Sequence, residues 1–250
     1  MQGEAIHAEA PAGLPDAGPS EPAAERVRRR TRIKFCGLVR GCDVDTAVAL
    51  GVDAIGFVFY PPSRRCLDER DAAALRRRLP SFVAAVGLFV DEAAGRVEAV
   101  AARVGLDVIQ LHGNEQPAYA AAFGPRVWRA HRISPGYDLA RETAAWRDAE
   151  FHLLDSASPG FGGSGHAFDW SLAQASGLTG LRTLVAGGLD ASNVGAAIAA
   201  LRPFGVDTAS GIEGATPRCK DPDRMERFVA AVRTADDAEP RAIRSTRSPR

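Results

Sequence analysis

Short apolar runs alternate with amphipathic segments along most of the chain. The apolar runs are nearly continuous, which is typical of strands that are buried on both faces of a parallel sheet. Eight of them are visible: RIKFC, AIGFVF, FVAAVGLFV, DVIQLH, RVWRAH, FHLLD, RTLVAG and GVDTAS. This alternation predicts an α/β architecture with a parallel sheet.

The segments between these runs suit helices. In Ala93–Arg103 and just beyond it, Val97, Val100 and Val104 recur at steps of three and four residues, which puts them on one helix face. Eight strands alternating with helices in about 200 residues predict one closed (β/α)8 TIM barrel. An open, doubly wound sheet is the alternative, although the turn after the first strand lacks its G-x-G-x-x-G fingerprint. The other predicted helices are Asp43–Leu50, Asp68–Leu79, Gln116–Phe123, Asn193–Leu201 and Pro222–Val232.

The two ends of the chain have a different composition from the rest. Residues 1–30 are rich in Ala, Pro, Gly and Glu, and residues 235–250 are similarly poor in large apolar side chains. Such segments cannot bury enough surface to offset the entropy of ordering, so we predict two disordered tails around a barrel domain at 31–234. The first tail has no apolar core of a secretory signal. Its basic run at 26–32 is either a solvated tail or a nucleic-acid tether.

Charge and cysteine content narrow the class of protein. The 31 basic and 31 acidic residues cancel, which argues against nucleic acid as the main partner. No apolar stretch reaches the roughly 18 residues of a membrane span. The four cysteines show neither a zinc-binding spacing nor the density of a disulfide scaffold, which favours a cytoplasmic protein without a structural metal.

Several polar and glycine residues lie at, or just after, the carboxyl ends of the predicted strands. In a closed barrel these ends meet on one face, where TIM-barrel enzymes have their active sites. Distant parts of the chain are therefore predicted to share one pocket, lined by Cys36, Arg65, His112, Asp155, Gly187, Gly188, Asp207, Ser210 and Gly211.

The motifs that contain these residues, in this order, resemble the phosphoribosylanthranilate isomerases of tryptophan biosynthesis. They are KFCGLVRGCD, GVDAIGFVFYPPSRR, VGLFVDE, IQLHGNE, LLDS, GGSGHAFDW, VAGGLDASNV and GVDTASGIE, and the similarity covers most of the chain between Arg32 and Val232. The family usually has Ile or Val in place of Phe35, Thr in place of Val39, and Lys or Gln in place of His166.

The resemblance implies an aldose–ketose isomerase. Its substrate would be N-(5-phosphoribosyl)anthranilate, an aldosylamine, and its product 1-(2-carboxyphenylamino)-1-deoxyribulose 5-phosphate. This Amadori rearrangement needs no metal and no organic cofactor. The small phosphosugar substrate would be the main partner, and the sequence leaves both a monomer and a homodimer open.

Such a reaction needs one group that takes a proton and one that gives a proton. Cys36 is the candidate general base, because cationic neighbours at a strand end can lower the pKa of a thiol. Its alternative role is that of a small buried hydrophobic residue, which we assign to Cys42, Cys66 and Cys219. Asp155 is the candidate general acid, because a partly desolvated carboxyl group can keep its proton near neutral pH. Its alternative role is a loop or N-cap carboxylate.

The resemblance also assigns binding roles. Arg65 would bind the anthranilate carboxylate through its guanidinium fork, with the adjacent Arg64 as the alternative and a solvated surface arginine as the ordinary explanation. Gly187, Gly188, Ser210 and Gly211 follow the seventh and eighth strands, where TIM barrels bind phosphate, although glycines of this kind also occur in ordinary turns.

Three further features have weaker assignments. We give His112 and Asp207 secondary binding or orienting roles, although a lone histidine is more often a satisfied core residue. The glycine-rich loop at 158–168, with His166, could close over the substrate.

Two other functions are possible for a phosphosugar barrel of this kind. A barrel acting on an aminoimidazole substrate of histidine synthesis would carry aspartates after its first and fifth strands, whereas this chain has Cys36 and the run RVWRAH there. A catalytically silent phosphosugar-binding barrel would be expected to lack Cys36 or Asp155, and both are present.

Overall fold

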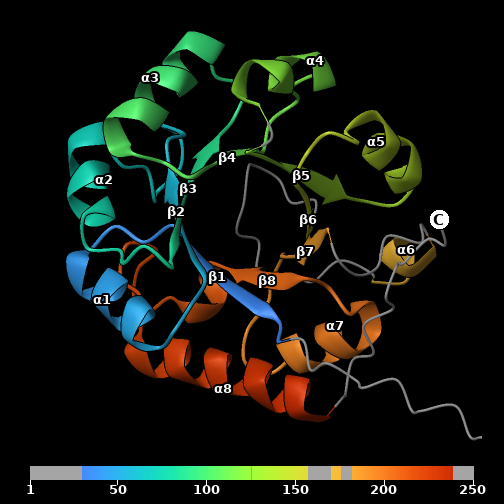
Figure 1. Cartoon of the computed structure of the whole chain (residues 1–250). Coiled ribbons are helices and arrows are strands. Elements are labelled where there is room, and N and C mark those ends of the chain that lie inside the picture. Colours follow the sequence, from blue (N-terminus) through green and yellow to red (C-terminus); the bar gives the residue numbers. More distant parts are fainter. Residues whose placement is uncertain (1–29, 125, 157–169, 176–181, 239–250) are drawn as a thin grey trace, which may run out of the picture.

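The computed structural model describes residues 30–124, 126–156, 170–175 and 182–238. Eight parallel strands pair in sequence order and close on themselves, and helices surround them (Figure 1). This confirms the predicted TIM barrel. The strands are β1 (Arg32–Cys36), β2 (Ala54–Val58), β3 (Ala84–Phe89), β4 (Val108–Leu111), β5 (Val127–Ile133), β6 (Phe151–Ser156), β7 (Thr183–Val185) and β8 (Gly205–Thr208).

The outer layer consists of one helix after each strand. The predicted helix at Gln116–Phe123 is divided into a short α-helix and a 3-10 turn. The elements are α1 (Gly41–Ala49), α2 (Glu69–Arg76), α3 (Ala94–Val104), α4 (Pro117–Ala120), η1 (Ala121–Phe123), α5 (Leu139–Ala145), α6 (Trp170–Ala175), α7 (Val194–Leu201), η2 (Ser210–Ile212) and α8 (Pro222–Ala238).

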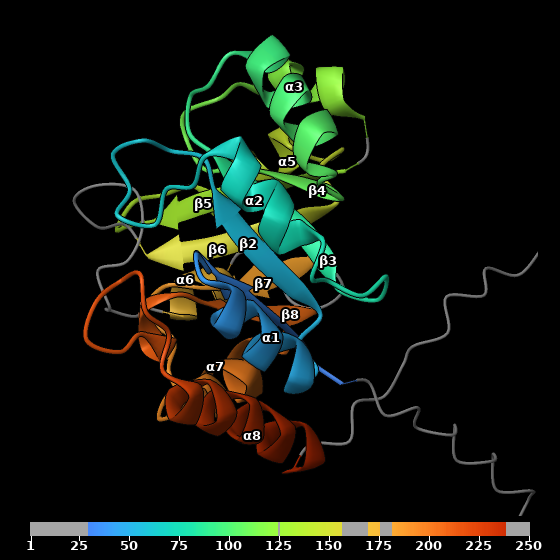
Figure 2. The same cartoon turned by 90° about the vertical axis from the view of Figure 1, so that its left-hand side faces the viewer.

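The last helix, α8, is longer than the sequence predicted. We expected it to end at Val232 and the domain at residue 234, but it continues to Ala238. Its last turns are tied to the start of β1, because Asp236 accepts hydrogen bonds from Thr31 N at 2.7 Å and Thr31 Oγ1 at 2.6 Å. The predicted boundary therefore falls inside a helix, which runs along the bottom of the molecule in Figure 2. The remaining residues of both predicted tails lie outside the described part.

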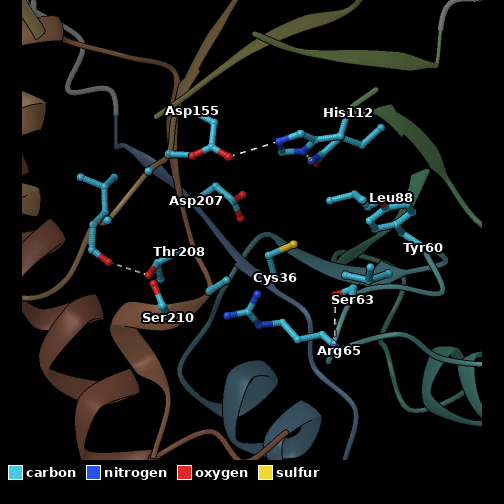
Figure 3. Close-up of a pocket in the computed structure, with 17 residues that line it drawn as sticks. Cys36, Tyr60, Ser63, Arg65, Leu88, His112, Asp155, Asp207, Thr208 and Ser210 are labelled. Atoms are coloured by element: carbon cyan, nitrogen blue, oxygen red, sulfur yellow. Dashed lines mark hydrogen bonds and ion pairs between the residues drawn. The ribbon is translucent and has the colours of Figure 1, made fainter. Parts of the chain in front are cut away.

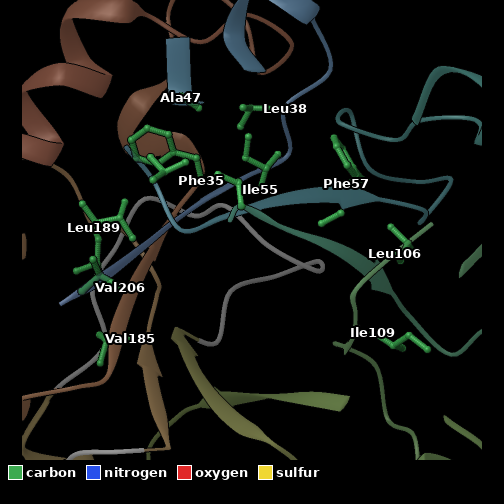
Figure 4. Packing of buried hydrophobic residues seen from close by; sticks show 14 of the residues in the cluster. Phe35, Leu38, Ala47, Ile55, Phe57, Leu106, Ile109, Val185, Leu189 and Val206 are labelled. Carbon is green, nitrogen blue, oxygen red and sulfur yellow. The ribbon is translucent and has the colours of Figure 1, made fainter. Parts of the chain in front are cut away.

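Successive side chains of each strand point alternately into the barrel and out toward the helices. On β1, Phe35 is fully buried in the outer core, where its ring meets Phe228 of α8 edge-on at 5.9 Å (Figure 4). Burial of a phenylalanine side chain contributes about 1.5–3 kcal/mol, which accounts for an aromatic ring at this position. Lys34 and Cys36 alternate with the outward-facing residues and so face the barrel interior, whose floor is a smaller apolar cluster that includes Trp128 and Leu153.

Two buried histidine rings lie on the outward side of β5 and β6, and one of them contacts the partly buried Tyr137. His131 Nε2 is 3.0 Å from His152 Nδ1, and His131 Nδ1 is 2.9 Å from the Tyr137 hydroxyl. Burial lowers the pKa of His131 to about 2 and that of His152 to about 4. Both rings are therefore neutral in the folded protein at neutral pH.

Candidate active site

A cavity opens at the carboxyl ends of the strands (Figure 3). Of the nine residues predicted to share a pocket, eight line this cavity, and Gly211 does not. Arg65 is part of its lining and Arg64 is not. The further lining residues include Tyr60, Ser63, Leu88, Gln110 and Thr208. The prediction that distant strand ends meet in one pocket is therefore confirmed in geometry, while the chemical roles stay predictions.

Cys36 ends β1 and is only 6% exposed. The next residue, Gly37, turns the chain with a φ of +70°, a left-handed conformation that side chains with a Cβ rarely adopt. A Cβ at Gly37 would lie 2.3 Å from Cδ of Arg65. The Cys-Gly pair therefore ends the strand sharply and lets the Arg65 side chain cross directly beside it.

Cys36 has charged neighbours inside the barrel. Lys34 and Asp207 form a buried ion pair, with Lys34 Nζ 2.9 Å from Asp207 Oδ1. We expected cationic neighbours to lower the pKa of Cys36. Burial instead raises the pKa of the Cys36 thiol, and Lys34 opposes this effect without overcoming it. Burial also disfavours the charged form of Lys34, but the charges of Asp207 and Cys36 outweigh burial and raise the pKa of Lys34.

Asp155 lies across the cavity from Cys36, at the end of β6. Its Oδ1 accepts a hydrogen bond from Ser156 N at 2.8 Å, and its Oδ2 is 3.2 Å from His112 Nε2. The other nitrogen of the imidazole, Nδ1, is 3.3 Å from the side-chain amide of the fully buried Gln110. His112 is thus a buried histidine that lies between the candidate acid Asp155 and the side chain of Gln110.

Arg65 enters the cavity from the loop after β2, and Glu213 fixes its side chain. Its Nε donates a hydrogen bond of 2.6 Å to Glu213 Oε1, and the same oxygen is 3.1 Å from Lys220 Nζ. Lys220 also donates a hydrogen bond to the Ala209 carbonyl at 2.8 Å. Since Glu213 engages Nε, the terminal nitrogens of Arg65 are left to reach under Cys36, as Figure 3 shows.

The two candidate phosphate loops pack against each other. Gly187 and Gly188 both have positive φ angles, +79° and +64°, so the chain after β7 turns in a way that favours glycine. The carbonyl of Leu189 accepts a hydrogen bond of 2.7 Å from Thr208 Oγ1 of the neighbouring strand β8. A Cβ at Gly211 would lie 2.0 Å from that same carbonyl oxygen. Gly211 therefore allows close packing of the loops rather than lining the cavity.

Besides these further lining residues, three charged residues near the cavity were absent from the predicted set: Lys34, Glu213 and Lys220. A signal for two of them was present in the composition. Among 31 basic residues, Lys34 and Lys220 are the only lysines, and both are buried. The loop at 158–168, with His166, lies outside the described residues. Within the described part of the chain, no cluster of His, Cys, Asp or Glu side chains could hold a metal ion, and no helix is long and apolar enough to cross a membrane.

Comparison with known sequences gives one consistent result. The family model described as N-(5'phosphoribosyl)anthranilate (PRA) isomerase matches residues 33–231. The N-(5'-phosphoribosyl)anthranilate isomerase of Dechloromonas aromatica is 47% identical over 209 residues, which cover 84% of this chain and 99% of the relative. The enzyme of the same name from Bordetella petrii is 48% identical and covers 83% of this chain and 97% of its own length.

Solved structures agree with this result. Phosphoribosyl anthranilate isomerase from Thermotoga maritima superposes with a TM-score of 0.76 at 38% identity, covering 82% of this chain and 99% of its own. A phosphoribosyl anthranilate isomerase in complex with reduced 1-(o-carboxyphenylamino)-1-deoxyribulose 5-phosphate gives a TM-score of 0.73 at 35% identity, with coverages of 82% and 99%. Monomers generated from the dimeric Thermotoga maritima protein give 0.72 at 34% identity, with coverages of 81% and 98%.

Proposed function

The chain belongs to the N-(5'-phosphoribosyl)anthranilate isomerase family, and from this premise we propose that Cys36 is the general base and Asp155 the general acid of its reaction. The isomerisation belongs to tryptophan biosynthesis. Its substrate is N-(5'-phosphoribosyl)anthranilate, and its product is the ketose amine 1-(2-carboxyphenylamino)-1-deoxyribulose 5-phosphate. A related structure with the reduced form of that product bound supports this substrate class.

The observation that best supports these roles is the position of the two groups. Cys36 comes from β1 and Asp155 from β6, and both line the same cavity and are nearly buried (Figure 3). A sugar placed between them could meet an acid on one side and a base on the other. The two groups are thus arranged for two separate proton transfers to one substrate.

The first transfer opens the sugar ring. Asp155 gives its proton to the ring oxygen while the bond between that oxygen and C1 breaks, and the nitrogen lone pair forms a C1=N double bond. In the second transfer, the Cys36 thiolate takes the proton from C2. The C–H electrons form a C1=C2 double bond and return the nitrogen lone pair, which gives an enol. Tautomerisation of this enol, with protonation at C1 and loss of the C2 hydroxyl proton, yields the ketone.

The two ends of the substrate have separate binding groups. We assign the anthranilate carboxylate to Arg65, because its terminal nitrogens reach into the cavity and Arg64 is absent from the lining. We assign the phosphate to the backbone of Gly187, Gly188 and Ser210, which line the same cavity. A cytoplasmic location, the lack of a nucleic-acid partner, and the choice between monomer and homodimer stay predictions.

The test is substitution of the base, followed in an anthranilate fluorescence assay. Cys36→Ala should lower turnover by about 10²-fold or more, the usual scale for a general base. Cys36→Ser should be nearly as inactive, because a hydroxyl is a much weaker acid than a thiol and little of its base form exists near neutral pH. Cys42→Ala is the matched control, since Cys42 is exposed, and not buried as we expected, and lies outside the cavity. A Cys36→Ala enzyme with nearly normal kcat would end this mechanism.

A further inference from the structure

The chain uses arginine for almost all of its positive charges. Its only two lysines, Lys34 and Lys220, are 2% and 3% exposed, and both influence the ionisation of Cys36. Burying an ammonium group costs free energy unless it is paired and hydrogen-bonded. An ammonium group differs from guanidinium in being a compact point charge. The two lysines of this chain therefore occupy buried sites, where a compact cation fits, and the charges of both act on one thiol.

The space around the first of these lysines is shared with the thiol. Lys34 stands two residues before Cys36 on β1, so both side chains point into the barrel. The neighbouring strand β2 places Gly56 directly opposite Cys36. A Cβ at Gly56 would lie 2.8 Å from Sγ of Cys36 and 3.2 Å from Nζ of Lys34. The sulfur and the ammonium therefore occupy the same small space above Gly56, which only the absence of a side chain leaves open.

The other side of the ammonium is fixed by β8. Lys34 pairs in register with Asp207, and its Nζ is 2.9 Å from Asp207 Oδ1. Because both side chains are buried, the ion pair is screened little by solvent, and the carboxylate keeps the lysine protonated at neutral pH. Lys34 is thus a permanent, immobilised positive charge next to Cys36.

We propose that Lys34 is a positioning residue that stabilises the thiolate form of Cys36, with Asp207 holding its ammonium in place and Gly56 leaving the room for it. This inference rests on the proposed role of Cys36 as the base. Lys34 keeps its proton throughout: it compensates the thiolate before the reaction, and it remains paired with Asp207 after Cys36 has taken the proton from C2. Asp207 then acts by holding Lys34 rather than by touching the substrate.

The opposing electrostatic effects at the thiol support this assignment. Burial raises the pKa of Cys36, and the charge of Lys34 is the largest influence in the opposite direction. Without Lys34, the negative charge of Asp207 would be the largest electrostatic influence left on the buried thiol, and the thiolate would become rarer. The proposal therefore predicts a direction for the pH dependence, which a merely structural lysine would not give.

The second lysine provides a matched control. Lys220 is as deeply buried and carries the same charge, but its ammonium contacts Glu213 and the Ala209 carbonyl, behind Arg65. Removing it should disturb the arginine that we assign to the substrate carboxylate. We therefore expect Lys220→Met to act mainly on KM and Lys34→Met mainly on kcat.

The experiment measures the thiolate without turnover. The full-length wild type, Lys34→Met and Lys220→Met are treated with iodoacetamide across a range of pH values, and alkylation of the Cys36 peptide is followed by mass spectrometry. Lys34→Met should slow alkylation at neutral pH by about tenfold or more, with the profile displaced to higher pH, because the thiolate is the reacting form. Its kcat should fall and partly recover at alkaline pH. Lys220→Met should slow alkylation much less than Lys34→Met, because the charge of Lys220 is a smaller influence on the thiol, and it should show a raised KM.

Folding is controlled separately. Lys34→Met leaves Asp207 as an unpaired buried charge, which could prevent folding. The double variant Lys34→Met/Asp207→Asn removes that charge, and its alkylation should still be slower than that of the wild type. A folded Lys34→Met or double variant whose Cys36 is alkylated with the wild-type pH profile would overturn the proposal. If instead Cys36 is not the base, Cys36→Ala will have a nearly normal kcat. That outcome does not depend on the alkylation rates, so the two failures can be distinguished.

Discussion

The two sides of the cavity surround the proposed base and the proposed acid in different ways. On the side formed by β1, β2 and β8, Cys36 lies among the ion pairs of Lys34 with Asp207 and of Arg65 with Glu213. On the side formed by β4 and β6, Asp155 contacts an imidazole and a backbone N–H. The proposed base, which would act as an anion, thus lies beside buried cations, whereas neither of these two contacts of the proposed acid comes from a lysine or arginine side chain.

This difference follows from the charge that each group carries when it is ready to react. A thiolate in a buried position needs a nearby positive charge, or the thiol keeps its proton. A carboxylic acid would lose its proton too readily beside an arginine or lysine. The barrel separates the two environments by placing their residues on opposite strands of one closed sheet.

The largest expected effect tests the acid side. Asp155→Asn keeps the shape of the side chain but cannot give a proton to the ring oxygen, so turnover should fall by about 10²-fold or more in the fluorescence assay. Asp148→Asn, on a side chain that is 95% exposed, is the control and should keep wild-type turnover. Near-normal kcat in Asp155→Asn would show that another group gives the proton. The contrast between the surroundings of base and acid would then no longer hold.

The helix-facing side of β5 and β6, behind the proposed acid, should make the stability of the fold depend on pH. His131 and His152, on the outward faces of β5 and β6, have pKa values lowered to about 2 and about 4 by burial, against 6.5 for the unfolded chain. Below pH 6.5 the unfolded state binds protons that the folded state does not, so stability is lost as the pH falls from 6.5 toward 4. Urea unfolding should show a loss of at least about 2 kcal/mol between about pH 7 and about pH 5.

A matched variant checks the origin of this pH dependence. His152→Gln removes one of the two titrating rings while keeping a polar side chain, and should flatten the stability profile between about pH 7 and about pH 5. The slope in this range would have another source if the variant kept the full wild-type dependence.

A smaller effect is expected at the proposed phosphate site. Its residue Gly188 follows β7, which belongs to neither of the two sides compared above. Gly188→Val would place a branched side chain where φ is +64° and where we propose that the backbone approaches the phosphate, so KM should rise about tenfold or more while kcat changes less. Gly105→Val is the control for backbone strain, because Gly105 has a φ of +76° and a Cβ at this position would meet no heavy atom of the described chain within 4 Å. Equal KM values for Gly188→Val and the wild type, with the fold intact, would move the phosphate elsewhere.

The smallest effect concerns the domain boundaries. A chain of residues 30–238 should keep the melting temperature and turnover of the full chain, as we propose that the residues outside it add no core. A chain of residues 30–234 loses the two hydrogen bonds between Asp236 and Thr31, and should be less stable by about 1–2 kcal/mol. Equal melting temperatures for the two truncated chains would show that this contact contributes nothing, and a large loss in the longer one would show that a tail contributes to the fold.

Much of the fold could be predicted from the sequence because strand and helix patterns are local. The eight apolar runs and the valine stripe of α3 are visible in neighbouring residues, and the barrel order follows from short connections between them. The helix ends were less predictable. The extension of α8 to Ala238 brings Asp236 into contact with Thr31, and these two residues come from opposite ends of the described chain.

By itself, the sequence determined the strand order, the glycine turns and the set of strand ends that face one cavity, because these depend on local pattern and on the rule that parallel strands end on one side. Only the tertiary structure decided which charges meet. Lys34 meets Asp207 because β1 closes the barrel against β8, and Lys220 meets Glu213 behind Arg65 because loops from distant parts of the chain converge. The pKa of Cys36 depends on burial and on these distant partners together, so residue type at position 36 alone could not give its direction.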